Sequence, residues 1–336
     1  MTSTPPTLAA WLEEWAASRR HHLEASSVVS YRWMADSYLV PHLGKVRLDH
    51  LDVRTLESTY AKLLAAGGRG GRPLAPRTVA YTHAVLHRAL VDAVRLGVIN
   101  VNVAADATVP RRAVDGRPPR RLRVWDADQV RQFLADTANH PLADLWAVAL
   151  GTGMRRGELL GLRQRDLKLE HQQLTVATAL VVIDGTPRWK APKTGRTRLL
   201  SLDDRTVRAL QRRLDAAPTA DPDLPVFADA GGNPLDPGQV SHQWRTLMRT
   251  LDLPTIRLHD LRHTHATLLL AAGVPVKVVS ERLGHTKIAM TLDVYTHVLP
   301  AQDRAAALTM GELLDNDKRG SFIAAGPGAT VDTTET

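Results

Sequence analysis

A basic, proline-rich segment divides this chain into two regions of different character. Residues 106–124, DATVPRRAVDGRPPRRLRV, contain three prolines, six arginines and two aspartates, without a helical or alternating apolar period. Proline fixes its own backbone and has no N–H to donate, so we expect an extended linker here. A chain of 336 residues has room for about two domains. We therefore predict one domain at 1–105 and a second at 125–315.

The first region has the pattern of a small all-α domain. The last of its expected helices runs from about 77 to 96, where apolar residues recur at helical spacing before Gly97. We expect the second helix of this region to end before Pro41. Polar residues suited to N-capping precede the other helices: Thr7, Ser26 with Ser27, and Asp52.

The second region mixes helical and β-rich patterns. Asp126 and Gln129 form a candidate capping box, after which two helices are expected. The runs LTVATALVVI and RTRLLSL are β-rich, and residues 239–315 again read as helical. This predicts a mainly α domain with a small β-sheet, an α+β class. Residues 316–336 are polar and rich in Gly and Thr, and we expect them to be disordered.

The charge of the chain, +8 overall, is concentrated in its first third and in the linker. Residues 1–105 hold 12 Lys and Arg against 8 Asp and Glu, whereas residues 125–336 hold 25 of each sign. This distribution favours binding to a polyanion, although a solvated basic surface and a passive spacer are the alternatives. The linker arginines are candidate phosphate contacts: Arg111, Arg112, Arg120, Arg121 and Arg123.

Composition excludes several classes of protein. The chain has no cysteine, which rules out disulfides, thiolate nucleophiles and cysteine-bound zinc. Nowhere does it approach the roughly 18 uninterrupted apolar residues of a membrane span. The first residues, MTSTPPTLAAWLEEW, lack the basic and apolar regions of a signal peptide. We expect a cytoplasmic protein.

Four segments of the second region concentrate arginine, lysine and histidine beside one tyrosine. Attack on a phosphodiester adds negative charge to the phosphate oxygens, which requires a metal or fixed cationic donors. An arginine can bind two phosphate oxygens at once. A tyrosine with an ordinary pKa of about 10 needs cations or a base to act as a nucleophile. The segments are GTGMRRGELLGL (151–162), PKTGRTRLL (192–200), LHDLRHTHAT (258–267) and ERLGHTKIAMTLDVYTHV (281–298).

Three residues of the third segment share one face if the segment is helical. His259, Arg262 and His263 lie at positions i, i+3 and i+4. His259 and Arg262 can then approach the same anion. The alternative is a metal site formed by the histidines with His265, but the positive charge of Arg262 on the same face opposes a cation there.

Together these segments resemble the tyrosine recombinase family, also called the phage integrases. The family's boxes correspond to Thr152-Gly153 with Arg155 and Glu158, to His259-x-x-Arg262, to Leu283-Gly284-His285 and to Tyr295 ten positions further on, with Lys193 as the lysine of the β-hairpin. The helical first region is similar to the family's core-binding domain in pattern and order. The resemblance implies a C-shaped clamp that closes around DNA.

The resemblance also implies a role for each residue. Arg155 and Arg262 would bind the scissile phosphate, and Tyr295 would attack it to form a 3′-phosphotyrosyl bond. Lys193 would protonate the leaving 5′ oxygen. The bond energy is retained in the intermediate, so that neither ATP nor a metal is needed.

Histidines and a glutamate complete the implied site. His285 would donate a hydrogen bond to the phosphate, and His259 would assist proton transfer at the tyrosine. Glu158 is interpreted as a structural residue that helps to hold the site.

The implied function is site-specific recombination of a mobile element in a bacterium or phage, at the nucleoid. Double-stranded DNA and further copies of the chain, as a tetramer on paired sites, are the expected partners, with an accessory DNA-bending or directionality protein. Residues 301–314 would form a helix that docks on a neighbouring copy. The chain begins almost directly with the core-binding helices, which disfavours bridging to distant arm sites.

Two other functions are compatible with parts of the sequence. A type IB topoisomerase shares the phosphotyrosine chemistry but acts alone. A DNA-binding regulator would explain residues 275–295, which resemble a helix-turn-helix. The regulator leaves Arg155 and His259 without a role.

Overall fold

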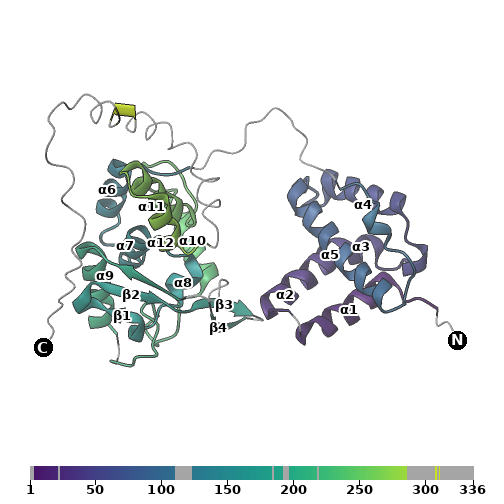
Figure 1. The fold of residues 1–336 in the computed structure, drawn as a ribbon, viewed down its shortest axis with the longest axis horizontal. Coiled ribbons are helices and arrows are strands. Elements are labelled where there is room, and N and C mark those ends of the chain that lie inside the picture. The colour runs from purple at the N-terminus through teal and green to yellow at the C-terminus, as the bar shows by residue number, and fades with distance from the viewer. Residues whose placement is uncertain are drawn as a thin grey trace, which may run out of the picture. The chain divides into compact units, whose positions relative to one another are not determined.

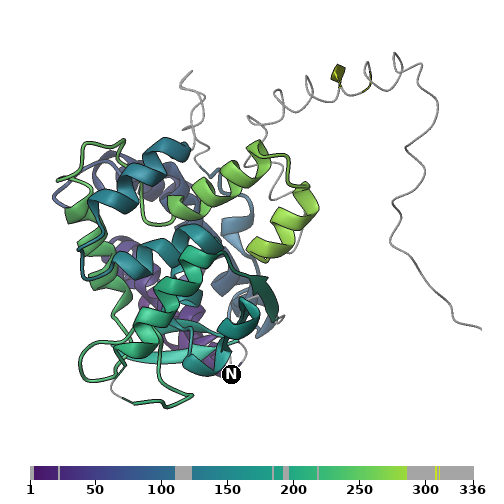
Figure 2. The same ribbon diagram turned by 90° about the vertical axis from the view of Figure 1, so that its left-hand side faces the viewer.

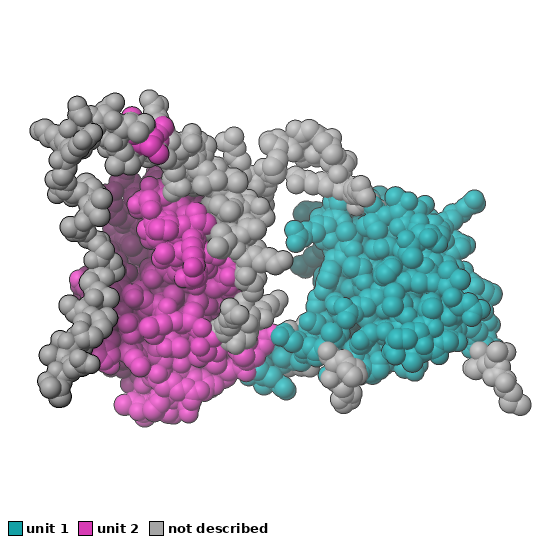
Figure 3. All heavy atoms as spheres, in the orientation of Figure 1, with its two compact units in different colours: residues 1–121, 181–188 teal, residues 122–180, 189–336 magenta. Residues whose placement is uncertain are grey.

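The computed structural model describes most of the chain up to residue 285. The chain forms two compact units, residues 1–121 with 181–188 and residues 122–180 with 189–336 (Figure 3). Each unit has its own hydrophobic core. The described residues are 4–21, 23–109, 123–183, 185–191, 197–217 and 219–285, together with 307, 308 and 310.

The described part of residues 1–109 in the first unit is built from helices, as the sequence predicts. Thr7 caps the first helix through its hydroxyl, which accepts from the N–H of Ala10 at 3.4 Å. Asp52 caps another by accepting from the N–H of Thr55 at 2.7 Å. Its elements are α1 (Leu8–Ser18), η1 (Arg19–His21), α2 (Ala25–Met34), η2 (Ala35–Leu39), α3 (Val40–Leu43), η3 (Leu48–His50), α4 (Val53–Ala66), α5 (Pro76–Arg95) and η4 (Val103–Ala105).

The second helix departs from the prediction at its start. It begins at Ala25 with Glu24 in the N-cap position, so that the expected serine cap is wrong. At its other end the α-helix stops at Met34, before Pro41 as expected, but helical backbone continues beyond it. The π-helix η2 follows directly, and α3 then carries Pro41 in its first turn, where a helix does not need the missing N–H. The wider π turn therefore keeps the chain helical through the proline.

Tryptophans of α1 anchor the core of this unit on α5. The indole N–H of Trp11 donates to the backbone oxygen of Ala89 at 3.0 Å. That of Trp15 donates to a carboxylate oxygen of Asp92 at 2.6 Å, and Arg19 forms an ion pair with the same carboxylate. Both indoles are thus buried without an unsatisfied donor.

The second unit is mainly helical with small sheets, which confirms the predicted fold class (Figure 1). Asp126 and Gln129 form the expected capping box at the start of α6. The elements are α6 (Ala127–Asp136), α7 (Ala143–Thr152), α8 (Arg156–Leu160), η5 (Gln164–Asp166), β1 (Leu167–Lys168), η6 (Leu169–His171), β2 (Gln173–Val176), β5 (Arg198–Ser201), α9 (Asp204–Asp215), α10 (Pro237–Leu247), α11 (Asp260–Ala271) and α12 (Val276–Leu283). The hairpin of β3 (Ala179–Ile183) and β4 (Thr186–Lys190) is divided between the units, because its residues 181–188 belong to the first.

The strands form two separate sheets. β1, β2 and β5 make an antiparallel sheet in that order, in which Leu174 pairs with Leu167 on one side and Leu200 on the other. β3 and β4 pair with each other. The β-rich run 174–183 is therefore divided between two sheets. Residues 248–259 connect α10 and α11 without α-helix, so the helical interpretation of residues 239–315 was too broad at this point.

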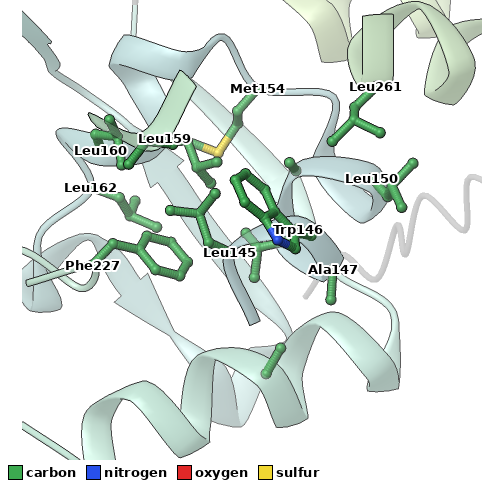
Figure 4. Packing of buried hydrophobic residues seen from close by; sticks show 14 of the residues in the cluster. Leu145, Trp146, Ala147, Leu150, Met154, Leu159, Leu160, Leu162, Phe227 and Leu261 are labelled. Carbon is green, nitrogen blue, oxygen red and sulfur yellow. The ribbon is translucent and has the colours of Figure 1, made fainter. Parts of the chain in front are cut away.

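Helix α7 lies at the centre of the second unit. Its sequence, ADLWAVALGT, is apolar on all sides, as expected of a helix surrounded by protein. It packs against α6, α8, α9 and α11. Figure 4 shows Trp146 among the side chains of Leu145, Met154 and their neighbours. Helices α11 and α12 contact each other and are seen side by side in Figure 2. The carboxyl end of α7 is thus fixed by packing.

Of the helices in the described part of the chain, none combines the length and apolar content of a bilayer-spanning segment. The residues 307, 308 and 310 are the described members of the helix expected at 301–314. The rest of that helix and the tail at 316–336 lie outside the described residues.

Removal of the Trp244 side chain should destabilise the second unit strongly. Trp244 is 1% exposed, and its indole N–H donates to the backbone oxygen of Ile256 at 2.9 Å. Trp244→Ala should cost about 3–5 kcal/mol of unfolding free energy, because it leaves a cavity between packed aromatic rings. Urea unfolding followed by far-UV circular dichroism measures the loss. Trp33→Ala is the control, since Trp33 is 55% exposed. Equal losses in the two variants would contradict this view of the core.

Candidate active site

The carboxyl end of α12 collects three arginine side chains. The last carbonyl groups of a helix lack partners within the helix and form the negative end of its dipole. Here three successive backbone oxygens each accept a hydrogen bond from a different guanidinium. The pairs are Arg198 Nε with Arg282 O (3.0 Å), Arg262 Nη2 with Leu283 O (2.6 Å), and Arg155 Nη2 with Gly284 O (3.3 Å).

Gly284 permits this arrangement. Its φ of +66° lies in the left-handed region, which ends the helix and turns its last carbonyls toward the arginines. A Cβ atom at this position would lie 2.9 Å from Nη1 of Arg198. Glycine is therefore needed both for the turn and for the approach of the guanidinium.

Arg262 joins the ends of two helices. Its Nη1 donates to the backbone oxygen of Gly153 at 2.7 Å, while its Nη2 reaches the end of α12. Gly153 follows α7 with φ +64°, and a Cβ there would lie 2.6 Å from Cδ2 of His265. Arg262 is only 4% exposed. This arginine is held in a fixed position beneath the surface.

Glu158 supplies the negative charge that balances two of the arginines. Its buried carboxylate accepts from the backbone N–H and from Nη1 of Arg155, both at 2.9 Å. It also accepts from Nη1 and Nη2 of Arg198 at 3.2 and 2.7 Å. Burial by itself would raise the pKa of Glu158, but the bonds and charges of Arg198 and Arg155 outweigh it and lower the pKa to about 2. Glu158 thus holds the site, as its sequence interpretation expects.

The structure distinguishes Arg155 from its neighbour Arg156. Arg155 turns toward Glu158 and α12, and its side chain is 38% exposed. Arg156 donates instead to the backbone oxygen of Pro237 at 3.0 Å, at the start of α10. Of the two, Arg155 is the one at the site, and a ligand in solvent can reach it.

Histidines lie beside the arginines. Desolvation and then the Arg262 charge lower the pKa of His259, the residue before α11. Desolvation, followed by Arg262 and Arg155, lowers the pKa of His285 to about 4. The rings of His259 and His263 meet edge to face at 5.1 Å. These imidazoles are neutral at neutral pH, when they can both donate and accept hydrogen bonds.

The described residues thus bring together four of the six candidates for catalysis: Arg155, His259, Arg262 and His285. Lys193 and Tyr295 lie outside the described residues, as do Arg111, Arg112, Arg120 and Arg121 of the linker. Arg123, at the start of the second unit, is exposed.

Arg198 was not predicted as a site residue, although the sequence carries a signal for it. Side chains two residues apart on a strand share a face, so that Arg198 lies on the same side of β5 as the buried Leu200. A cation on the inner face of a strand requires a partner, and Arg198 finds Glu158.

His265 does not fit the metal-site alternative. Its Nδ1 is 2.7 Å from the backbone oxygen of Leu150, and its Nε2 accepts from Nε of Arg282 at 3.2 Å. Both ring nitrogens are engaged within the protein. Across the described ranges, no group of three or more His, Asp or Glu side chains is arranged to hold a metal ion.

The buried His265 should make stability depend on pH. Desolvation and the Arg282 charge lower its pKa to about 4, from 6.5 when unfolded. Between these values the unfolded chain binds a proton that the folded chain excludes. The unfolding free energy should therefore fall from pH 7 to pH 5, by at most about 1.4 kcal/mol per pH unit for this group. Urea unfolding at a series of pH values should show a shallower fall of the unfolding free energy from pH 7 to pH 5 for His265→Phe. The control His242→Phe, at an exposed position, should keep the fall seen in the unaltered chain. Identical slopes in all three proteins would contradict this.

Comparison with known proteins places the site in a family. A tyrosine recombinase XerC-like protein of Caldanaerobacter subterraneus is 29% identical over 225 residues, 60% of this chain and 58% of that relative's length. The Tn1549 transposon integrase, solved with circular intermediate DNA, superposes with a TM-score of 0.70 and 21% identity, covering 87% of this chain and 95% of the other. A lambda integrase from a tetramer bound to a Holliday junction gives 0.63 and 18%, covering 85% and 79%. Residues 123–302, over half of the chain, match the model of the Phage integrase family, and the chain belongs to this family.

Proposed function

We propose that this chain is a site-specific DNA recombinase that cuts and rejoins DNA through a covalent 3′-phosphotyrosyl intermediate, without a metal or ATP. One observation carries the proposal. In a chain of the Phage integrase family, arginines and histidines from four separate segments meet at the carboxyl end of α12. Fixed cationic donors of this kind stabilise the charge that develops on an attacked phosphate.

Arg155 and Arg262 would bind the non-bridging oxygens of the scissile phosphate. Both guanidiniums are oriented before DNA arrives, Arg155 by Glu158 and Arg262 by two backbone oxygens. Little reorganisation is then needed during the reaction. Arg155 is accessible as it stands, whereas Arg262 must become accessible when DNA is bound.

Tyr295 would attack the phosphorus atom. The bond from phosphorus to the 5′ oxygen breaks as the bond to the tyrosine oxygen forms. Lys193 would give a proton to the 5′ oxygen, and His259 would accept the tyrosine proton. His285, kept neutral by its surroundings, would donate a hydrogen bond to the phosphate. A 5′-hydroxyl from a partner strand reverses the step and restores the tyrosine.

Double-stranded DNA is the proposed substrate, and recombination of a mobile element the proposed outcome. We assign DNA binding to residues 1–105 and to the arginines of a linker at 106–124, catalysis to residues 125–315, and no role to the tail at 316–336. Four copies would assemble on paired sites, since the related lambda integrase is solved as a tetramer on a Holliday junction. An accessory DNA-bending or directionality protein, and action in the cytoplasm at the nucleoid, belong to the same proposal.

Covalent trapping tests the nucleophile. The chain is incubated with nicked fragments of bacterial DNA, whose cleavage releases a short strand and prevents rejoining. Covalent complexes are recovered under denaturing conditions and sequenced. Tyr295→Phe should bind the recovered DNA but form no adduct, because phenylalanine lacks the attacking oxygen. Tyr81→Phe, altered in the first unit where Tyr81 is 41% exposed, is the control and should form adducts normally. Adducts with Tyr295→Phe, or none with the unaltered chain, would contradict the proposal.

A further inference from the structure

The buried His265 and the partly buried Arg282 form a pair next to the three arginines at the end of α12. His265 is 7% exposed. All nitrogen atoms of the two side chains take part in one network of hydrogen bonds. The contacts are His265 Nδ1 with Leu150 O (2.7 Å), Arg282 Nε with His265 Nε2 (3.2 Å), Arg282 Nη1 with Ser201 O (3.0 Å), and Arg282 Nη2 with Gly151 O (2.9 Å).

The pair touches each segment that carries an arginine of the site. Leu150 and Gly151 lie in the last turn of α7, just before Arg155. Ser201 ends β5, the strand that begins with Arg198. His265 follows Arg262 by three positions on α11, and the backbone oxygen of Arg282 is itself the acceptor of Arg198. The ends of α7 and β5 are thus joined to α11 and α12 by two side chains.

The network fixes the protonation of His265. A guanidinium can only donate, so Nε2 of His265 must be the acceptor of the bond from Arg282. Nδ1 therefore carries the proton and donates to Leu150 O. A second proton would place an imidazolium against Arg282, with Arg262 also near and Asp203 the opposing charge. The pair is complete only while His265 is neutral.

We propose that His265 and Arg282 are positioning residues for strand cleavage. They set the spacing of α7, β5, α11 and α12, so that the guanidiniums of the site meet at the end of α12. The inference rests on the proposed function, and neither side chain is assigned a contact with DNA. A displacement of about 1 Å in a reacting group can cost 100-fold in rate, so that a modest shift of these elements is enough to slow cleavage.

A positioning role can be separated from a role in stability. Apolar side chains of similar size often replace a buried polar network with little loss of stability, whereas they do not reproduce its directional bonds. His265→Phe with Arg282→Met is such a replacement. The double variant should remain folded but lose the bonds to the ends of α7 and β5.

The test measures covalent adduct formation in a single turnover, on a nicked duplex of the sequence that the unaltered chain captures. His265→Phe, Arg282→Met and the double variant should each form adducts roughly 10- to 100-fold more slowly at saturating DNA, with half-saturation unchanged. The double variant should be no slower than either single variant, because the two residues act as one unit. His265→Gln, whose amide can accept from Arg282, should recover part of the rate.

A second measurement is independent of cleavage. In the ¹⁵N-labelled full chain, Arg282→Met should shift the Nε–H resonances of Arg155 and Arg262, while Arg245→Met, on exposed residue Arg245 of α10, should leave them unchanged. Normal adduct rates in the variants, or rates that fall only in parallel with DNA binding, would overturn the pair's role. Unshifted resonances would do the same. Absence of adducts with the unaltered chain would instead refute the proposed function. The Nε–H resonances of Arg155 and Arg262 would then decide whether the pair positions these two guanidiniums.

Discussion

The attraction between the carboxyl end of α12 and three guanidiniums is the interaction on which the site depends. Three arginines in close proximity repel one another, and the arrangement persists because each is bonded to one of three successive carbonyl oxygens. Glu158 adds a full negative charge between two of them. The resulting cluster is cationic and is held together by hydrogen bonds before a ligand binds, which suits it to an anion whose charge grows during a reaction.

The rest of the second unit serves to bring helix ends together. The largely buried α7 is followed by Gly153, whose backbone oxygen provides the second acceptor for Arg262. Gly284 ends α12 in the same left-handed conformation. At both positions a Cβ atom would collide with a side chain of the site, Arg198 at one and His265 at the other. Packing of the core and geometry of the site are therefore set by the same residues.

Local signals in the sequence predicted much of the fold and part of the site. Thr7, Asp52 and the pair Asp126–Gln129 cap helices as expected, since a cap depends only on residues within one turn. The π turn that carries the chain through Pro41 could not be predicted, because it depends on packing around that turn. His259-x-x-Arg262 was recognised as one helical face, but the burial of Arg262 arises from carbonyls more than twenty residues away in sequence. His265 and Arg282 lie on different helices, and no spacing rule reveals their hydrogen bond.

Substitution of Gly284 tests most directly whether the end of α12 organises the arginines. Gly284→Ala strains a positive φ and places a methyl group against Arg198. Gly273→Ala is the matched control, since Gly273 has φ +82° but open space around it. If α12 gathers the guanidiniums as described, single-turnover adduct formation by Gly284→Ala should fall roughly 10-fold or more below that of Gly273→Ala, at equal DNA affinity. Equal rates in the two variants would show that the helix end does not set the geometry of the site.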